Sequence, residues 1–201
     1  FGDRHHFLHR DRLRHRADPV HRRARMGNAA IAANDVVHRL DALAARNQYI
    51  LKADPKHVAS LRTAGFDLLG LANNHAMDFG TGGARETLKH LGVIGVAHAG
   101  LGRNRAEART PRLITAEDST FALSALGIIG NAYTSPAEDE KRPGQLSYTQ
   151  DRDLDEAIAT LAATQADYRI LSVHYGQEFE VKTAAADRRR LTQAVASGAD
   201  M

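Results

Sequence analysis

The sequence predicts an α/β fold in which helices flank a largely buried sheet. Residues 66–71 and 168–173 are almost continuously apolar, which is typical of strands that are covered on both faces. Segments with the apolar spacing of amphipathic helices lie before and after these two runs. Short strands that alternate with helical segments indicate the α/β class rather than an all-helical or all-strand protein.

The first half of the predicted fold runs from residue 54 to residue 97. Asp54 followed by Pro55 marks the start of a helix, because Asp is a favoured N-cap and Pro suits the first helical position. Gly65 marks the end of this helix. The remaining elements of this half are a strand over 66–71, a helix over 81–91 closed by Gly92, and a strand over 93–97.

The second half begins with a hairpin. A polar turn at 117–119 joins two runs of strand-forming residues, 112–116 and 121–126. Pro and Gly interrupt residues 131–148, which we expect to form a loop. The last elements are a helix over 151–164, the strand 168–173 and a closing helix over 184–197.

Charge is distributed unevenly along the chain. The 201 residues carry a formal charge of +3, but residues 1–25 alone carry eight Arg and three Asp, so the remaining residues carry −2. A domain that binds nucleic acid should present basic residues over a face of the fold, so binding of nucleic acid is not expected outside residues 1–25. We therefore divide the chain into an Arg/His-rich arm, residues 1–25, which is disordered or aberrant, and one globular domain, residues 26–201.

Composition excludes several other classes. The chain has no Cys, which excludes disulfides, thiolate metal sites and a cysteine nucleophile. We find no apolar run of the roughly 18–20 residues that a membrane-spanning helix needs. The arm has Arg and His where a secretory signal would have an apolar core, so the sequence predicts no export signal and leaves the compartment open.

Polar side chains follow two of the predicted strands directly. Residues 72–78 after the strand 66–71 include Asn74, His75 and Asp78, and residues 174–178 after the strand 168–173 include His174 and Glu178. Ligands of open α/β folds bind just beyond the carboxyl ends of strands, so we expect these side chains at one edge of the sheet. Imidazole, amide and carboxylate groups suit Mn, Fe or Zn. The same residues also suit turn chemistry and ordinary hydrogen bonding, and this alternative stays open.

Two segments carry a resemblance to a known family. The run GFDLLGLANNHAMDFGTGGARETLKHLGVIGVAHAGLG (65–102) resembles the bacterial capsule-synthesis CapA family, and ILSVHYGQEFE (170–180) resembles the histidine-glycine loop of that family. The resemblance extends from about residue 48 to the end of the chain. It implies a layered metallophosphoesterase-like α/β fold and a role in the synthesis of a poly-γ-glutamate capsule.

The resemblance also implies roles for individual residues. It makes His75 the catalytic residue that acts on substrate oxygens, and it makes Asn74 and His174 ligands of a divalent metal ion (Mn, Fe or Zn). Side chains expected around the ligands or the substrate are Asn73, Asp78 and Glu178. Asp3 is a doubtful metal ligand, since only Gly2-Asp3 echoes the Gly-Asp that ends the first strand of the family.

The chain departs from the family pattern at both ends. No Glu precedes Glu86, so the glutamate ligand of the Asn-Leu-Glu segment is missing, and the Gly-His-x-Pro-His loop does not occur before residue 201. We therefore expect an incomplete fold and an incomplete metal site. Because the first strand should be lost, we also expect an unpaired edge beside residues 66–71, with marginal stability or self-association.

Two functional interpretations follow from the resemblance. The first is a metallophosphoesterase-type protein that acts on an anionic polymer, or on a phosphate- or peptide-type substrate, at the cell envelope. The alternative is a non-catalytic accessory module that binds an anionic polymer or a membrane-bound capsule synthase.

Overall fold

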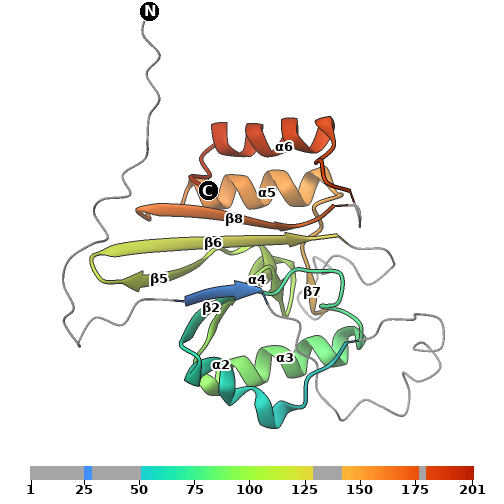
Figure 1. Cartoon of the computed structure of the whole chain (residues 1–201), viewed down its shortest axis with the longest axis vertical. Coiled ribbons are helices and arrows are strands. Elements are labelled where there is room, and N and C mark those ends of the chain that lie inside the picture. The colour runs from blue at the N-terminus through green and yellow to red at the C-terminus, as the bar shows by residue number, and fades with distance from the viewer. Residues whose placement is uncertain (1–24, 29–50, 129–141, 177–179) are drawn as a thin grey trace, which may run out of the picture.

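Two small β-sheets lie face to face between two layers of helices (Figure 1). The computed structural model describes residues 25–28, for which only the backbone is considered, and residues 51–128, 142–176 and 180–201. The described elements, in chain order, are β1 (Arg25–Asn28), η3 (Pro55–His57), α2 (Ala59–Thr63), β2 (Phe66–Gly70), α3 (Gly80–Ile94), β3 (Ala97–Ala99), β4 (Leu101–Gly102), α4 (Arg105–Arg109), β5 (Arg112–Ala116), β6 (Ser119–Gly127), β7 (Gly144–Gln145), α5 (Asp151–Ala162), β8 (Tyr168–His174) and α6 (Ala185–Ala196).

The sheets explain why the strand ends meet. One sheet has the order β1-β2-β3 with parallel pairing throughout, and the other has the order β5-β6-β8 with β6 and β8 parallel. β4 and β7 form a short antiparallel pair beside them. In Figure 1 the arrows of β1, β6 and β8 point to the same side of the molecule. Since β2 is parallel to β1, the carboxyl ends of β2, β6 and β8 lie at one edge.

Each pair of neighbouring layers has its own apolar core. The sheets pack on each other through small and medium side chains, including Leu68, Ala99 and Leu123. α3 covers the outer face of the first sheet through a cluster that includes Leu69, Leu88 and Leu91, and α5 covers the second sheet through a separate cluster. Each fully buried Leu contributes roughly 2–3 kcal/mol of transfer free energy, so this packing is the main source of stability.

Several predicted elements are confirmed. The layered α/β class is confirmed, with the refinement that the strands divide between packed sheets. β2, α5, β8 and α6 match the predicted ranges to within a few residues at each end, and the hairpin is the β5–β6 pair. Gly65 ends the predicted first helix in a left-handed conformation with φ of 87°, although that helix is divided into η3 and α2.

The prediction for residues 93–97 is wrong in its first part. α3 continues to Ile94, and β3 begins only at Ala97. Gly92 is a regular helical residue, whereas Gly95 takes the left-handed conformation with φ of 67° that closes the helix. The amides of Gly95 and Val96 bond back to the carbonyls of Gly92 and Leu91, which is the Schellman pattern of hydrogen bonds.

Two further expectations need correction. The edge beside residues 66–71 is not unpaired, because β1 pairs with β2 on the side opposite to β3. Residues 131–148 are predicted to be a loop, and 131–141 lie outside the described residues. In the described part of this segment, Gly144 and Gln145 form β7 and pair with β4. Side chains 145–148 are buried, so this segment is part of the core rather than a surface connection. The prediction for the Arg/His-rich arm concerns residues 1–25, of which 1–24 lie outside the described residues.

A buried ion pair holds α4 against α5. The guanidinium of Arg105 contacts the carboxylate of Asp153, and the two residues are 6% and 0% exposed. The second oxygen of Asp153 accepts a hydrogen bond of 2.7 Å from the backbone amide of Ser147. Since Ser147 forms a bridge with Gly127, this pair also fixes the segment that lines the end of β6.

The backbone of β6 lies close to the backbone of another segment at Gly127. A Cβ atom at this position would lie 2.7 Å from the backbone nitrogen of Asn73, which is closer than real Cβ contacts allow. The amide of Gly127 donates to the Leu146 carbonyl at 3.1 Å, and its carbonyl accepts from Tyr148 at 3.0 Å. Glycine is therefore required at this crossing for steric reasons.

We predict that Gly127→Ala destabilises the chain by about 1–3 kcal/mol, because the added methyl group must displace backbone rather than a flexible side chain. Gly92→Ala is the matched control, since a Cβ there meets nothing within 4 Å. The control should raise the free energy of unfolding by about 0.5–1 kcal/mol, the usual gain for Ala over Gly in a helix. Urea denaturation measures both changes in the free energy of unfolding. Equal stability of the two variants would contradict the close backbone contact at Gly127.

Candidate functional site

The first loop of the site follows β2 and is folded by Asn73. This residue is 6% exposed, and its side-chain oxygen accepts a hydrogen bond of 2.9 Å from the amide of His75. The side-chain nitrogen of Asn73 donates to the Leu71 carbonyl at 3.3 Å, and the Asn73 carbonyl accepts from Gln145 at 2.8 Å. Asn73 was expected near the ligands or the substrate, and in the structure it shapes the turn that presents the next two residues.

His75 and Asp78 form a hydrogen-bonded pair within this loop. Nδ1 of His75 lies 2.8 Å from Oδ2 of Asp78, and their side chains are 23% and 4% exposed. The same carboxylate oxygen accepts a hydrogen bond of 2.8 Å from the backbone amide of Leu51. Asp78 is therefore held from two directions and fixes the orientation of the imidazole ring.

Asn74 completes the arrangement on the other side of the ring. Its Nδ2 lies 3.2 Å from Nε2 of His75. Of the two neutral tautomers, a carboxylate at Nδ1 and an amide donor at Nε2 together favour the one that carries its proton on Nδ1. In this tautomer Nε2 keeps its lone pair, so His75 has the arrangement of a base that is oriented by an acid.

The second loop reaches the same edge through β6. His174 is the last residue of β8, is exposed, and pairs in register with Gly127 of β6. The amide of Ile128 donates to the His174 carbonyl at 2.8 Å. Since the backbone of Asn73 lies close to Gly127, both predicted loops adjoin one strand end.

The structure thus brings most of the predicted site residues to one edge. Asn73, Asn74, His75 and Asp78 share one loop, and His174 lies across β6 from it. Asp3 and Glu178 lie outside the described residues. Their placement around a metal or substrate stays a prediction.

A polar and aromatic pocket adjoins His174 and was not predicted from the sequence. It has a volume of about 780 Å³, and its wall includes Tyr148, Tyr175, Lys182 and Asp187. The rings of Tyr148 and Tyr175 lie 4.6 Å apart between centroids, so the residue after His174 is packed against a buried aromatic side chain. This pocket is of the size that small-molecule sites occupy.

Tyr148 connects the pocket to α6. Its hydroxyl donates to Oδ1 of Asp187 at 3.2 Å, and the guanidinium of Arg190 lies over its ring at 4.6 Å. Burial, together with the negative charge of Asp187, raises the pKa of Tyr148, so the hydroxyl stays protonated at neutral pH. Tyr148 could not be predicted as a functional residue, because it lies in a Pro- and Gly-containing segment with no periodic pattern. The one indication in the sequence is that an aromatic residue occurs in a polar stretch.

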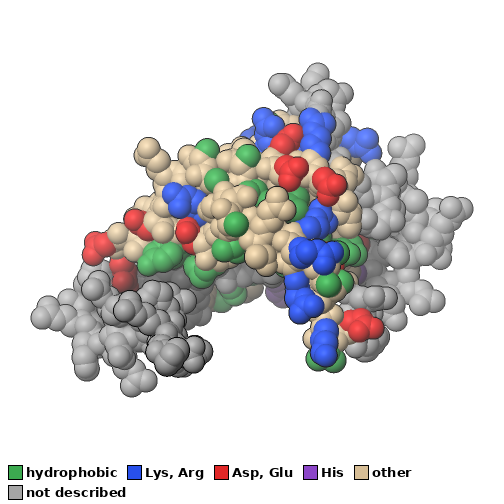
Figure 2. Space-filling view, turned by 90° about the horizontal axis from the view of Figure 1, so that it is seen from above, with side chains coloured by type: hydrophobic (Ala, Val, Ile, Leu, Met, Phe, Trp, Pro, Cys, Tyr) green, Lys and Arg blue, Asp and Glu red, His purple; other side chains and the backbone are tan. Residues whose placement is uncertain are grey.

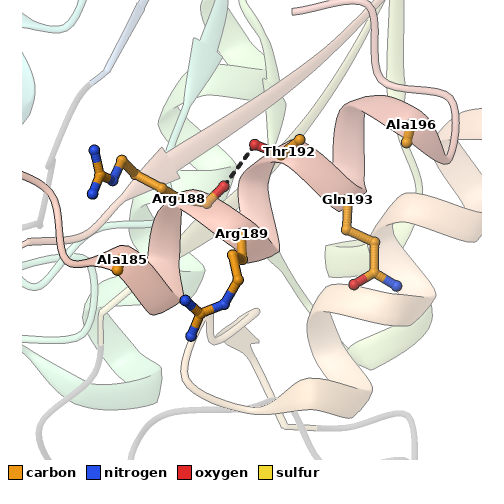
Figure 3. A pocket seen from close by; sticks show the side chains of 6 residues that line it. All are labelled: Ala185, Arg188, Arg189, Thr192, Gln193 and Ala196. Atoms are coloured by element: carbon orange, nitrogen blue, oxygen red, sulfur yellow. Dashed lines mark hydrogen bonds between the residues drawn. The ribbon is translucent and has the colours of Figure 1, made fainter.

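The outer face of α6 is a different kind of surface. A groove of about 490 Å³ is lined by six residues that all belong to this one helix, among them Arg188 and Arg189. Figure 3 shows these six side chains along α6. Figure 2, seen from the α6 side, shows Lys and Arg side chains gathered on one part of this face with Asp and Glu among them. Because the lining comes from a single helix, the groove is open surface and not a convergent site.

The described residues alone do not make a metal centre. Within residues 51–128, 142–176 and 180–201, no three His, Asp or Glu side chains gather as metal ligands would. Asn74 offers a neutral amide, which is a weak ligand without anionic partners. We therefore derive no catalytic step that runs through a metal ion.

The packed sheets, their helical layers and the strand-end Asn-His loop define a protein of the metallophosphoesterase-like α/β class. The chain belongs to the family described as bacterial capsule synthesis protein PGA_cap, which matches residues 17–201. The resemblance noted in the sequence is thereby confirmed.

Curated relatives agree with this family. The chain is 25% identical over 153 residues to the capsule biosynthesis protein CapA of Bacillus anthracis, covering 75% of this chain and 37% of that protein. It is 26% identical over 170 residues to the PGA biosynthesis protein CapA of Bacillus subtilis, covering 84% and 43%. A probable polyglutamine synthesis accessory protein of Mycobacterium tuberculosis is 28% identical over 163 residues, covering 78% and 43%.

The chain spans only 20–43% of the length of the curated relatives that it matches. In the part of the chain that the structure describes, no helix has the length and apolar character needed to cross a membrane.

We predict that Asp78→Ala changes the tautomer of His75. In the unmodified chain, long-range ¹H–¹⁵N spectra should show the proton on Nδ1, and loss of the carboxylate should move it toward Nε2. The variant should also lose about 1–3 kcal/mol of stability, because Asp78 is nearly buried and accepts two hydrogen bonds.

Asp54→Ala is the control for this variant. Asp54 also accepts a backbone hydrogen bond, but it is more exposed and lies at the start of η3, so its loss should leave the His75 spectrum unchanged. A His75 that carries its proton on Nε2 in the unmodified chain would contradict the assigned orientation.

Proposed function

We propose that the strand-end site performs acid–base hydrolysis or group transfer on an anionic polymer during poly-γ-glutamate capsule synthesis. The observation that carries this proposal is the His75–Asp78 pair, which is fixed by a turn at the carboxyl edge of the sheets and faces Asn74. The family supplies the biological context, and the geometry supplies the chemistry.

The chemistry follows from the protonation of the pair. With its proton on Nδ1, His75 can accept a proton at Nε2 from a water molecule or a substrate hydroxyl. The imidazolium that results is stabilised by the carboxylate of Asp78, 2.8 Å away, and can return the proton to a leaving group. The Asn74 amide must rotate from Nε2 when substrate enters, which makes it available to donate to a substrate oxygen.

A divalent metal ion (Mn, Fe or Zn) belongs to the proposal only through its candidate ligands. Asn74 and His174 would hold it, and further ligands would have to come from outside the described residues. When bound, such an ion polarises an oxygen of the substrate and lowers the pKa of a water molecule. Asp78 is not one of the proposed ligands. Its carboxylate already accepts hydrogen bonds from the Leu51 amide and from His75, and it orients the imidazole ring.

The substrate class and partners are inferred from the relatives. The Bacillus subtilis relative is named for PGA biosynthesis, so the proposed substrate is an anionic polymer with amide or phosphate-type bonds. A membrane-bound capsule synthase and a location at the cell envelope belong to the same proposal.

A non-catalytic accessory role is the second candidate. It is favoured by one observation: the described residues do not gather three metal ligands. The Mycobacterium tuberculosis relative is likewise named an accessory protein. In this role the chain would bind the polymer or a synthase without turnover.

We predict that His75→Ala lowers kcat/KM about 10²–10⁴-fold, the usual contribution of a positioned acid–base group. The assay follows hydrolysis of poly-γ-glutamate and of bis(4-nitrophenyl) phosphate, with Mn, Zn or Fe added and with each withheld. His90→Ala is the matched control, because His90 also faces a carboxylate and its side chain is 24% exposed against 23% for His75. The control should retain full activity.

The outcomes separate the two candidates. Turnover that falls in His75→Ala and not in His90→Ala supports the catalytic function. Polymer binding without turnover supports the accessory role, and turnover that is equal in both variants contradicts the assignment of His75. Metal analysis of the purified chain reports whether Mn, Zn or Fe copurifies, and His174→Ala should lower that content if His174 is a ligand.

A further inference from the structure

A second cleft lies on the α3 side of the molecule, apart from the strand-end site. It has a volume of about 710 Å³, and its lining comes from separate elements of the chain. α3 supplies Arg85, Leu88, Lys89 and Gly92, β3 supplies His98, and the segment from β4 into α4 supplies Arg103 and Glu107. The cleft therefore differs from the α6 groove, whose lining comes from one helix.

The charge of this lining is positive. Arg85, Lys89 and Arg103 carry three positive charges, and Glu107 carries the single negative one, which leaves a formal charge of +2. Glu86, which is not part of the lining, pairs with Lys89 at 3.1 Å and offsets part of this charge. Arg85 and Lys89 lie four residues apart on α3, so they occupy the same face about one helical turn from each other. Charges of one sign in a cleft raise the local concentration of ions of the opposite sign.

Arg103 is held in place before any ligand arrives. Both its backbone amide and its Nε donate to Oε2 of Glu107 at 2.8 Å. The amide of Glu107 in turn donates to the side chain of Asn104 at 2.8 Å, which caps α4. In the described part of the chain the Nη groups of Arg103 make no hydrogen bond, so its fork of donors is oriented and available.

The carboxyl group of Glu107 stays ionised in the cleft. Burial raises the pKa of this carboxyl, but the hydrogen bonds and the charge of Arg103 outweigh burial and lower it overall. Arg103 remains charged for the same reason, since its pKa is raised by Glu107. Both members of the pair therefore keep their charges in the cleft wall.

His98, which is part of the cleft lining, has a buried polar atom without a partner among the described residues. Its Nε2 is buried, and no hydrogen-bond partner lies within reach among the described residues. Burial first, and then the charge of Arg112, lower the pKa of His98, so the ring is neutral at pH 7. Buried polar atoms are nearly always hydrogen-bonded in native proteins, so an orphan beneath a cationic cleft indicates a position that a ligand or water completes.

We propose that this cleft is a binding site for an oxyanion, a carboxylate or phosphate group, held by Arg85, Lys89 and Arg103 over His98. The site is separate from the His75–Asp78 pair and does not require catalysis there. A chain of repeated carboxylates and a free phosphate share this chemistry, and the experiment below distinguishes them.

Isothermal titration of the full chain at low salt tests the proposal with two probes, inorganic phosphate and a γ-linked glutamate trimer. We expect 1:1 binding that weakens as salt is added, because the contacts are ionic and largely exposed. Tighter binding of the trimer identifies a polycarboxylate site, and equal or tighter binding of phosphate identifies a phosphate site. Binding of neither probe overturns the proposal.

Two variants localise the binding. Lys89→Gln should weaken it about tenfold, the effect of one lost charge-assisted contact. Lys56→Gln is the matched control: both lysines pair with a nearby carboxylate, and their side chains are 63% and 69% exposed. The control should bind as the unmodified chain does.

Gly92→Leu tests the cleft without changing its charge. Gly92 lines the cleft, and a Cβ there meets nothing within 4 Å, so a leucine side chain adds bulk to the cleft wall without displacing neighbouring atoms. Binding should be lost while thermal stability is kept. His75→Ala should leave binding unchanged, so failure of the catalytic proposal and failure of this one give different results. Unaltered binding in both Lys89→Gln and Gly92→Leu would place the ligand elsewhere and overturn the inference.

Discussion

The close approach of backbone at Gly127 is the constraint on which the candidate site depends. A Cβ at position 127 would lie 2.7 Å from the backbone nitrogen of Asn73, and the His174 carbonyl accepts from the amide of Ile128, the residue after β6. The two histidine loops are about a hundred residues apart in sequence, as residues 75 and 174. They become neighbours because β6 ends between them in a residue that has no side chain.

Neighbouring segments stabilise this contact between the backbones of Gly127 and Asn73. The buried Arg105–Asp153 pair fixes Ser147, which forms a bridge with Gly127, and Gln145 of β7 donates to the Asn73 carbonyl. Removal of one partner of a buried ion pair lowers the free energy of unfolding by more than the pair itself contributes, because it leaves an unpaired charge in the interior. The segment that joins β7 to α5 is thus as important for the site as the loops that carry its histidines.

Much of the site could be predicted from the sequence, because it follows from local patterns. The apolar run of β2 and the polar residues directly after it place Asn74, His75 and Asp78 at a strand end, and the same logic applies to His174 after β8. The limits of α3 could not be predicted as well: Gly92 and Gly95 are both plausible stops, and only the left-handed backbone of Gly95 decides between them. The roles of Gly127 and Tyr148 depend on contacts between distant segments, which leave no periodic signal in the chain.

Amide hydrogen exchange at the end of β6 tests the central claim most directly. The amides of Gly127, Ile128 and Tyr148 donate to Leu146, His174 and Gly127 respectively. These bonds tie His174 and residues 146–148 to one strand end, and the neighbouring Gln145 donates to the Asn73 carbonyl of the other loop. The account predicts that all three amides are protected as strongly as those in the middle of β6 and β8, so that they exchange only when the sheet opens. Exchange of Ile128 or Tyr148 at the rate of an unprotected amide would show that the loops are not held together, and would contradict the account.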